Sequence, residues 1–166
     1  MIALELLDVK ESMGKLLLSE TFDPFLFVEG TITTFNTFTI DGYLKKEFLD
    51  SEESAKLLEI RDFSLWKDMK GFCFSIIKGK KTPLNFKFIF RLSKENTSKL
   101  LQQEGLSYSI SDIQGLYLNL KFDGQRLECI TGTSMSLFTM DKSLEHAWDK
   151  MVQKFFQHHE IAFEIQ

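Results

Sequence analysis

The stretch LNFKFIFRL at residues 84–92 decides how this chain folds. Apolar residues at its even positions alternate with polar residues such as Lys87 and Arg91. This alternation is typical of a β-strand with one face on a core and the other in water. Ser93 follows directly and can cap a helix that extends to about Gln103. The centre of the chain therefore predicts a strand followed by a helix.

A second strand–helix unit opens the chain. Residues 2–7 are mostly apolar and predict a short strand. Asp8 is a suitable N-cap, and Glu11 stands three residues later in the capping-box position. The apolar spacing that follows predicts an amphipathic helix over residues 9–20.

Further strands are expected after each of these units. Residues 25–48 are rich in Phe, Thr and Ile and predict two or three strands. Asp41-Gly42 suits a type I′ turn, which predicts a hairpin there. Asp123-Gly124 predicts a second hairpin between residues 116–122 and 126–131.

The remaining segments alternate between helices and short strands. Apolar spacing predicts a helix after Ser64, although Gly71 leaves a strand over residues 72–77 open. The other expectations are a polar loop or short helix at residues 50–59, a short strand at 106–110, a last helix opened by Asp141 and a final strand at 161–165.

Two pairs of rare markers suggest an internal repeat. The Asp-Gly dipeptides at 41 and 123 and the tryptophans at 66 and 148 share an offset of 82 residues. The expected element order also agrees between the halves. We therefore predict a single α+β domain over residues 1–166, built as two pseudo-repeats of about 1–82 and 83–166 around an antiparallel sheet. The 17 phenylalanines are expected to form its core.

Composition narrows the class of protein. The chain is 43% hydrophobic and 27% charged, which is ordinary for a globular domain. No apolar run is long enough for a membrane-spanning helix, and no secretory leader is expected. Cys73 and Cys129 form no CxxC pair, which favours buried, reduced thiols in a cytoplasmic protein. A disulfide between them requires a fold that brings them close together.

A basic segment interrupts this acidic chain. Residues 64–99 contain nine basic and two acidic residues, whereas the whole chain has a net charge of −4. Such a segment attracts nucleic-acid phosphates or an acidic protein surface. It also fits a solvated face that pairs with acidic segments, within the fold or in a homo-oligomer. The candidate binding residues are Lys78, Lys80, Lys81, Lys87, Arg91, Lys94 and Lys99.

Common catalytic motifs are missing from the sequence. The loop at residues 79–82 departs from a phosphate-binding loop, because Phe74 replaces the first glycine and Lys81 replaces Ser or Thr. No GxGxxG or GxSxG pattern occurs. His158 and His159 would point apart on a helix, which favours a role at its C-terminus over metal binding. We therefore expect no metal and no cofactor.

Three stretches resemble a family of small uncharacterised bacterial proteins, and the likeness covers most of the chain. They are TITTFNTFTIDG at residues 31–42, SLWK at 64–67 and SLEHAW at 143–148. The resemblance implies no known activity and therefore no site residues.

The doubled element order also resembles the domain from which DNA sliding clamps are built. Residues 84–103 and 116–124 carry this likeness, whereas the helices around the two tryptophans depart from the clamp pattern. In clamps the helices face DNA and a surface pocket accepts short peptides. The resemblance thus implies that Lys94 and Lys99 face phosphates, in an assembly of several copies or with another partner.

These observations predict a non-catalytic binding or assembly module with a clamp-like fold. It would engage an acidic protein or a nucleic acid through the basic segment, without membrane contact. The alternatives are an enzyme whose pocket leaves no motif and a structural subunit of an oligomer.

Overall fold

The computed structural model describes the backbone of residues 1–166 and every side chain except those of residues 58–60. Its sheet has eight antiparallel strands in the order β3-β2-β5-β6-β7-β1-β8, with the short β4 paired to β2 beside this path. The strands are β1 (Ala3–Leu6), β2 (Leu26–Thr33), β3 (Thr37–Asp41), β4 (Ser64–Leu65), β5 (Asn85–Arg91), β6 (Ile113–Phe122), β7 (Leu127–Met135) and β8 (Phe163–Ile165).

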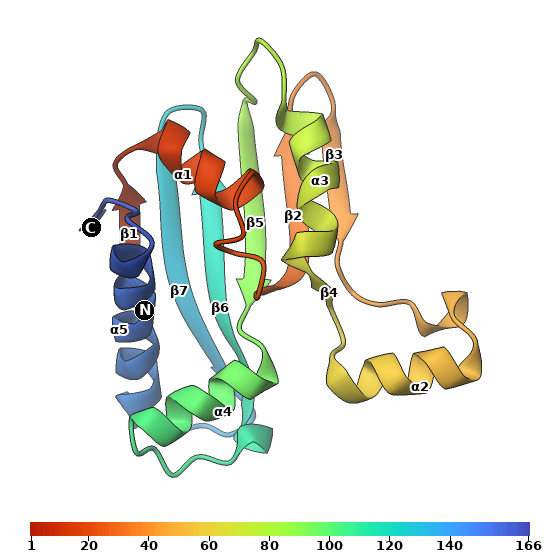
Figure 1. Cartoon of the computed structure of the whole chain (residues 1–166). Helices are drawn as coiled ribbons and strands as arrows, with labels where there is room; N and C mark the ends of the chain where they lie inside the picture. Colours follow the sequence, from red (N-terminus) through yellow and green to blue (C-terminus); the bar gives the residue numbers. More distant parts are fainter.

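Four of the five α-helices lie over one face of this sheet, and α2 projects to the side (Figure 1). The pattern of β5 explains this one-sided arrangement. Phe86, Phe88 and Phe90 are at most 2% exposed beneath the helices, whereas Lys87 is exposed on the other face. The predicted α+β class is confirmed. The helices are α1 (Val9–Leu17), α2 (Ser51–Ile60), α3 (Trp66–Ile77), α4 (Lys94–Gln103) and α5 (Ser143–His158), with 3₁₀ turns η1 (Lys46–Phe48) and η2 (Ile110–Asp112).

Aromatic rings form much of the core, as expected. The fully buried Trp66 ring lies 5.3 Å from the ring centroids of Phe27 and Phe88, and 4.9 Å from that of Phe90. The Trp66 indole N–H donates to the main-chain oxygen of Leu16 at 2.8 Å. This contact satisfies the buried indole and joins α3 to α1.

The two halves share their element order and the pairing of their last two strands, β2 with β3 and β6 with β7, but their first strands pair differently. Each begins with strand, helix and two strands, as β1-α1-β2-β3 and β5-α4-β6-β7. The predicted caps are present, since Asp8 accepts from the Glu11 N–H and Ser93 from the Asn96 N–H. However, β5 pairs with both β2 and β6, whereas β1 pairs with β7 and β8.

Only one of the predicted Asp-Gly hairpins forms. Asp123-Gly124 lies in the loop between β6 and β7, and Gly124 has a φ of +101°. The prediction at Asp41-Gly42 is wrong, because β3 ends at Asp41 and pairs with β2 instead. Glycine is required at position 42 because the main chain of Phe27 lies very close to it. A Cβ there would lie 1.9 Å from the main-chain oxygen of Phe27.

Two smaller predictions are also wrong. Residues 106–109 form no strand; they are irregular and lead into η2. Ser64 does not cap α3, because it pairs with Phe27 in the sheet and α3 begins one residue later than a Ser64 cap would require. The helical alternative for residues 72–77 is confirmed.

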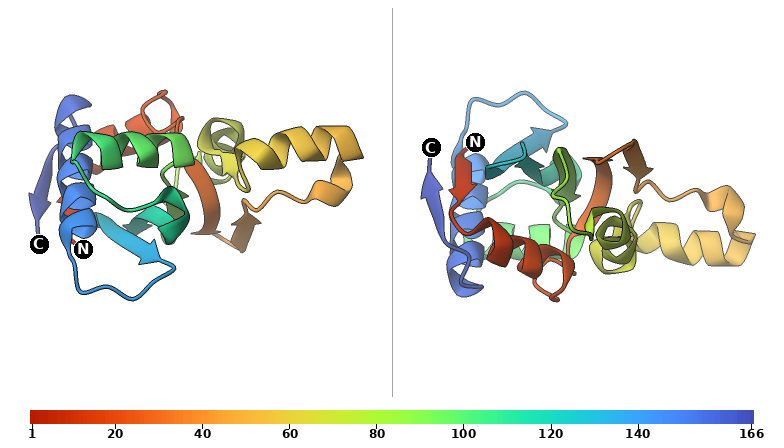
Figure 2. Two further views of the ribbon diagram at one scale, coloured as in Figure 1. Left: turned by 90° about the horizontal axis from the view of Figure 1, so that it is seen from below. Right: turned by 90° about the horizontal axis from the view of Figure 1, so that it is seen from above.

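Residues 44–62, which we call the arm, extend away from the sheet (Figure 2). The arm contains η1 and α2. Ser54 holds them together by donating its hydroxyl to the main-chain oxygen of Lys46 at 2.8 Å. Its two ends meet at a hydrogen bond from the Leu44 N–H to the Asp62 oxygen. The polar stretch at residues 50–59 is therefore helical for most of its length.

Candidate binding site

Three of the predicted lysines lie together in the loop that joins α3 to β5. Lys78, Lys80 and Lys81 are all exposed, and Gly79 between them has a φ of +148°, which favours glycine. Among the side chains that the structure describes, none of these three lysines forms an ion pair. Their ammonium groups are therefore available to a ligand.

This loop forms one wall of a groove of about 930 Å³. The opposite wall is α1, which adds a fourth lysine, Lys10, that was not among the predicted binding residues. Asp8 and Glu11 also lie at the rim, so lysines outnumber carboxylates by four to two. The floor is apolar and includes Val9, Met13, Leu17, Phe74, Ile77, Phe86 and Phe122.

The groove can hold an apolar group that carries negative charge at its edge. Burial of apolar surface would supply affinity, and the lysines would attract and orient the anionic part. Asp8 is already engaged, because its carboxylate accepts the Glu11 N–H and caps α1. The groove is thus suited to binding more than to acid–base chemistry.

The other predicted site residues do not join this groove. Lys87 lies on the uncovered face of the sheet, between Thr31 and Lys121 of the neighbouring strands. Lys94 and Lys99 lie on α4, near the opposite end of the sheet from the groove (Figure 1). Lys99 pairs with Glu95 at 3.3 Å on the surface of that helix.

Arg91 has a structural position. Its side chain is 9% exposed and forms a bidentate pair with Asp62 at the base of the arm. The guanidinium also lies 4.8 Å from the ring centroid of Phe63. Arg91 therefore fastens the arm to the sheet and is not available to a partner. The alternation in residues 84–92 correctly placed it opposite the phenylalanines, but did not reveal Asp62.

A sequence profile identifies the wider family. The profile of a family of unknown function, DUF5721, matches residues 15–164. The chain belongs to the DUF5721 family. No curated protein and no solved structure matches it.

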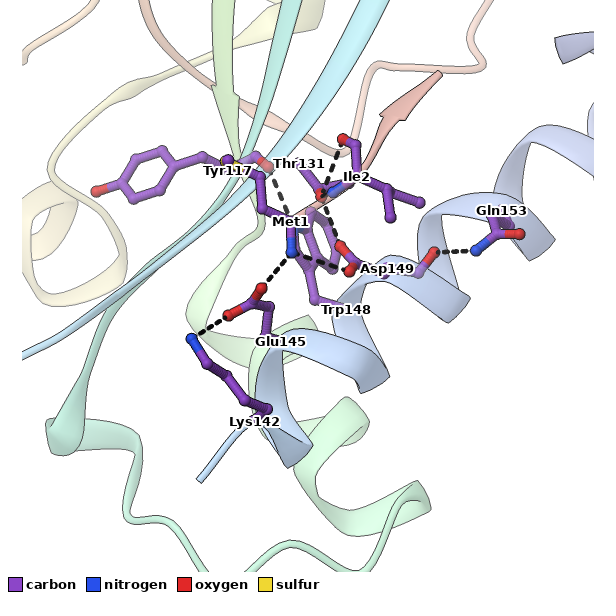
Figure 3. Close-up of polar contacts among 9 residues, drawn as sticks. All are labelled: Met1, Ile2, Tyr117, Thr131, Lys142, Glu145, Trp148, Asp149 and Gln153. Carbon is purple, nitrogen blue, oxygen red and sulfur yellow. Dashed lines mark hydrogen bonds and ion pairs between the residues drawn. The ribbon is translucent and has the colours of Figure 1, made fainter. Parts of the chain in front are cut away.

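A second polar cluster in this DUF5721 chain joins α5 to β1 and β7 (Figure 3). The buried Asp149 accepts a hydrogen bond of 2.5 Å from the Thr131 hydroxyl and one of 3.1 Å from the Met1 ammonium group. Glu145 also accepts from that ammonium group and pairs with Lys142. These hydrogen bonds lower the pKa of Glu145. Because the charges neutralise one another, the cluster is suited to holding the fold together.

The remaining candidate groups for chemistry are inert or isolated. Cys73 and Cys129 are buried and free, and burial raises the pKa of the Cys73 thiol to about 12. Such thiols are poor nucleophiles at neutral pH. Within the described side chains, no three His, Cys, Asp or Glu residues lie close enough together to hold a metal ion. None of the described helices of this DUF5721 member is long and apolar enough to cross a membrane.

Proposed function

We propose that this DUF5721 member is a non-catalytic binding module that captures an acidic, partly apolar protein segment in the groove between α1 and the 78–83 loop. The observation that carries the proposal is the combination of an apolar floor with a rim of unpaired lysines. An amphipathic acidic segment would match both features, because its apolar side chains enter the floor and its carboxylates meet the rim.

The positions of the basic residues favour a protein segment over nucleic acid. A nucleic acid is best held by cations that follow its backbone over several phosphates. Here the predicted lysines divide among the groove, the uncovered sheet face and α4, and Arg91 is paired internally. Among the described side chains, the groove gathers four lysines that form no ion pair beside apolar surface.

Two broader parts of the proposal rest on other features. The shared strand–helix–strand–strand order supports a clamp-like fold in which a surface pocket accepts a peptide. The buried free thiols support a reducing, cytoplasmic location. An enzyme is the less favoured alternative, since the capping role of Asp8 removes one carboxylate of the groove from chemistry.

The test is fluorescence anisotropy with a short labelled peptide composed of Glu, Phe and Ser. Binding should weaken as salt rises, because rim charges are screened over roughly 10 Å at 0.1 M salt. The double variant Lys80→Glu/Lys81→Glu should weaken binding by at least about tenfold. The matched control Lys94→Glu/Lys99→Glu makes the same change of charge on α4 and should leave binding within about twofold.

Three outcomes would overturn the proposal. They are no binding of the peptide, equal weakening by both double variants, and binding that does not depend on salt. A labelled DNA duplex measured in parallel addresses the alternative partner. Binding of the duplex that is lost in the α4 variant and kept in the loop variant would favour nucleic acid.

A further inference from the structure

The arm has surface properties that complement the groove. Phe48 is 91% exposed at η1, so a large apolar ring lies in water. Glu47, Asp50 and Glu53 lie near it in sequence and are exposed, as are Lys45 and Lys46. Lys45 pairs with Asp41, and the Asp50 carboxylate caps α2 by accepting the Glu53 N–H. The arm therefore offers an aromatic group with the Glu47 and Glu53 carboxylates and Lys46 near it, and the groove offers an apolar floor bordered by lysines.

Among the described side chains of the arm, several apolar groups border an open hollow. This hollow of about 540 Å³ lies between Tyr43 at the base of the arm and Lys45, Lys46, Phe48 and Leu57 of the arm itself. Apart from its base, which Arg91 and Phe63 hold against the sheet, the arm projects into solvent (Figure 2). Apolar side chains left in this way are typical of a surface that a partner covers.

An arm cannot reach the groove of its own chain. It returns to the sheet just before Trp66, at the start of α3, whereas Phe74, Ile77 and Lys78 of the groove lie at the end of that helix. The twelve residues of α3 separate the two features by roughly 18 Å. The arm also points away from the groove (Figure 1). Contact between them therefore requires two molecules.

We infer that the groove is occupied by the arm of a second copy of this chain, with Phe48 on the apolar floor and the arm carboxylates against Lys78, Lys80 and Lys81. The inference rests on the proposed function and names the partner of the same site. Because the two surfaces differ, the contact is heterologous: it leaves a free groove on the copy that supplies the arm and a free arm on the copy that supplies the groove. Repetition of the contact gives a closed ring or an open chain.

Sedimentation velocity over a concentration series tests the inference on the full-length chain. The wild-type protein should form species larger than a monomer, and its association should weaken with salt. Phe48→Ser removes the apolar anchor and should weaken association by at least about tenfold. Lys80→Glu/Lys81→Glu should do the same, whereas the control Lys94→Glu/Lys99→Glu should associate like the wild type.

A charge exchange makes the test specific. Glu47→Lys/Glu53→Lys should also abolish self-association, but a mixture of this arm variant with the Lys80→Glu/Lys81→Glu variant should form heterodimers. Circular dichroism establishes that each variant remains folded. A monomeric wild type at all concentrations, or association that persists in Phe48→Ser, would overturn the inference.

Binding of the labelled peptide distinguishes failure of the self-association from failure of the proposed function. The arm variant retains an intact groove and should still bind the peptide. Peptide binding without self-association of the wild type would leave the groove as a binding site for another protein. Loss of both would remove the proposed function as well.

Discussion

Trp66 and Trp148 allow the two halves of the chain to be compared, because each lies on a helix that covers the sheet. Both rings are buried, and both indole N–H groups donate to a main-chain oxygen, of Leu16 and of Tyr117 respectively. Their surroundings differ. Phe27, Phe88 and Phe90 surround Trp66, whereas Trp148 neighbours the charged cluster around Asp149 (Figure 3).

This difference corresponds to a division of roles. Aromatic packing, the hydrogen bond from Trp66 to Leu16 and the ion pair of Lys70 with Asp23 hold α3 in place, and the ends of that helix carry the arm and the lysine loop. In the second half, α5 is joined to β1 and β7 by hydrogen-bonded charges that bring distant parts of the chain together. The groove thus takes its four lysines from the first half, whereas the charged cluster joins the start of the chain to the second half.

Truncation of the two tryptophans should have the largest effect. Trp66→Ala and Trp148→Ala should each lower the free energy of unfolding by about 3–5 kcal/mol, since each leaves a large cavity and a main-chain oxygen without its donor. Urea denaturation followed by circular dichroism would measure both. A loss below about 1 kcal/mol at either site would show that its helix is not needed for stability.

Removal of the Asp149 carboxylate should come next. Asp149→Ala should lower the free energy of unfolding by about 1.5–3 kcal/mol, because the Thr131 hydroxyl and the Met1 ammonium group lose a charged, buried acceptor. Glu145→Gln is the comparison, and its more exposed carboxylate should matter less. Equal losses in the two variants would contradict a special role for the buried group.

The sequence predicted the elements of this fold better than their pairing. Alternation in residues 84–92 and the caps at Asp8 and Ser93 are local signals, and all three are confirmed. The hairpin predicted at Asp41-Gly42 was wrong, because Gly42 is required by its contact with the main chain of Phe27, a residue distant in sequence. Such tertiary contacts leave no local pattern.

The candidate site shows the same limit. The local density of lysines at residues 78–81 predicted a basic cluster, and these lysines do lie together at the groove. The pairing of Arg91 with Asp62 and the contribution of Lys10 depend on how separate elements pack.

Helix caps should distinguish the arm from the rest of the molecule. Asp8 caps α1 and Asp50 caps α2 in the same way, through the N–H groups of Glu11 and Glu53. Asp8→Ala should lower the global free energy of unfolding by about 1 kcal/mol. Asp50→Ala should leave it unchanged but accelerate amide hydrogen exchange within α2, because the arm opens locally. Asp→Asn at either site should restore the cap, and a global effect of Asp50→Ala would contradict independent opening.

The two Asp-Gly sites should differ in how they respond to salt, without a large effect on stability. A hydrogen bond from Lys45, aided by the Tyr43 N–H, lowers the pKa of Asp41, whereas the N–H groups of Arg126 and Gln125 lower the pKa of Asp123. Each carboxylate therefore contributes stability above its ordinary pKa of 3.8, and this contribution is lost as the pH falls through its lower value in the folded state.

Salt screens an exposed ion pair more than a main-chain hydrogen bond. NMR titration of the carboxyl carbons in about 1 M salt should move the pKa of Asp41 toward 3.8 and leave that of Asp123 in place. Lys45→Met should reproduce the salt effect at Asp41 alone. The pKa of Asp123 should not change, because it is lowered by main-chain N–H groups of the β6–β7 loop.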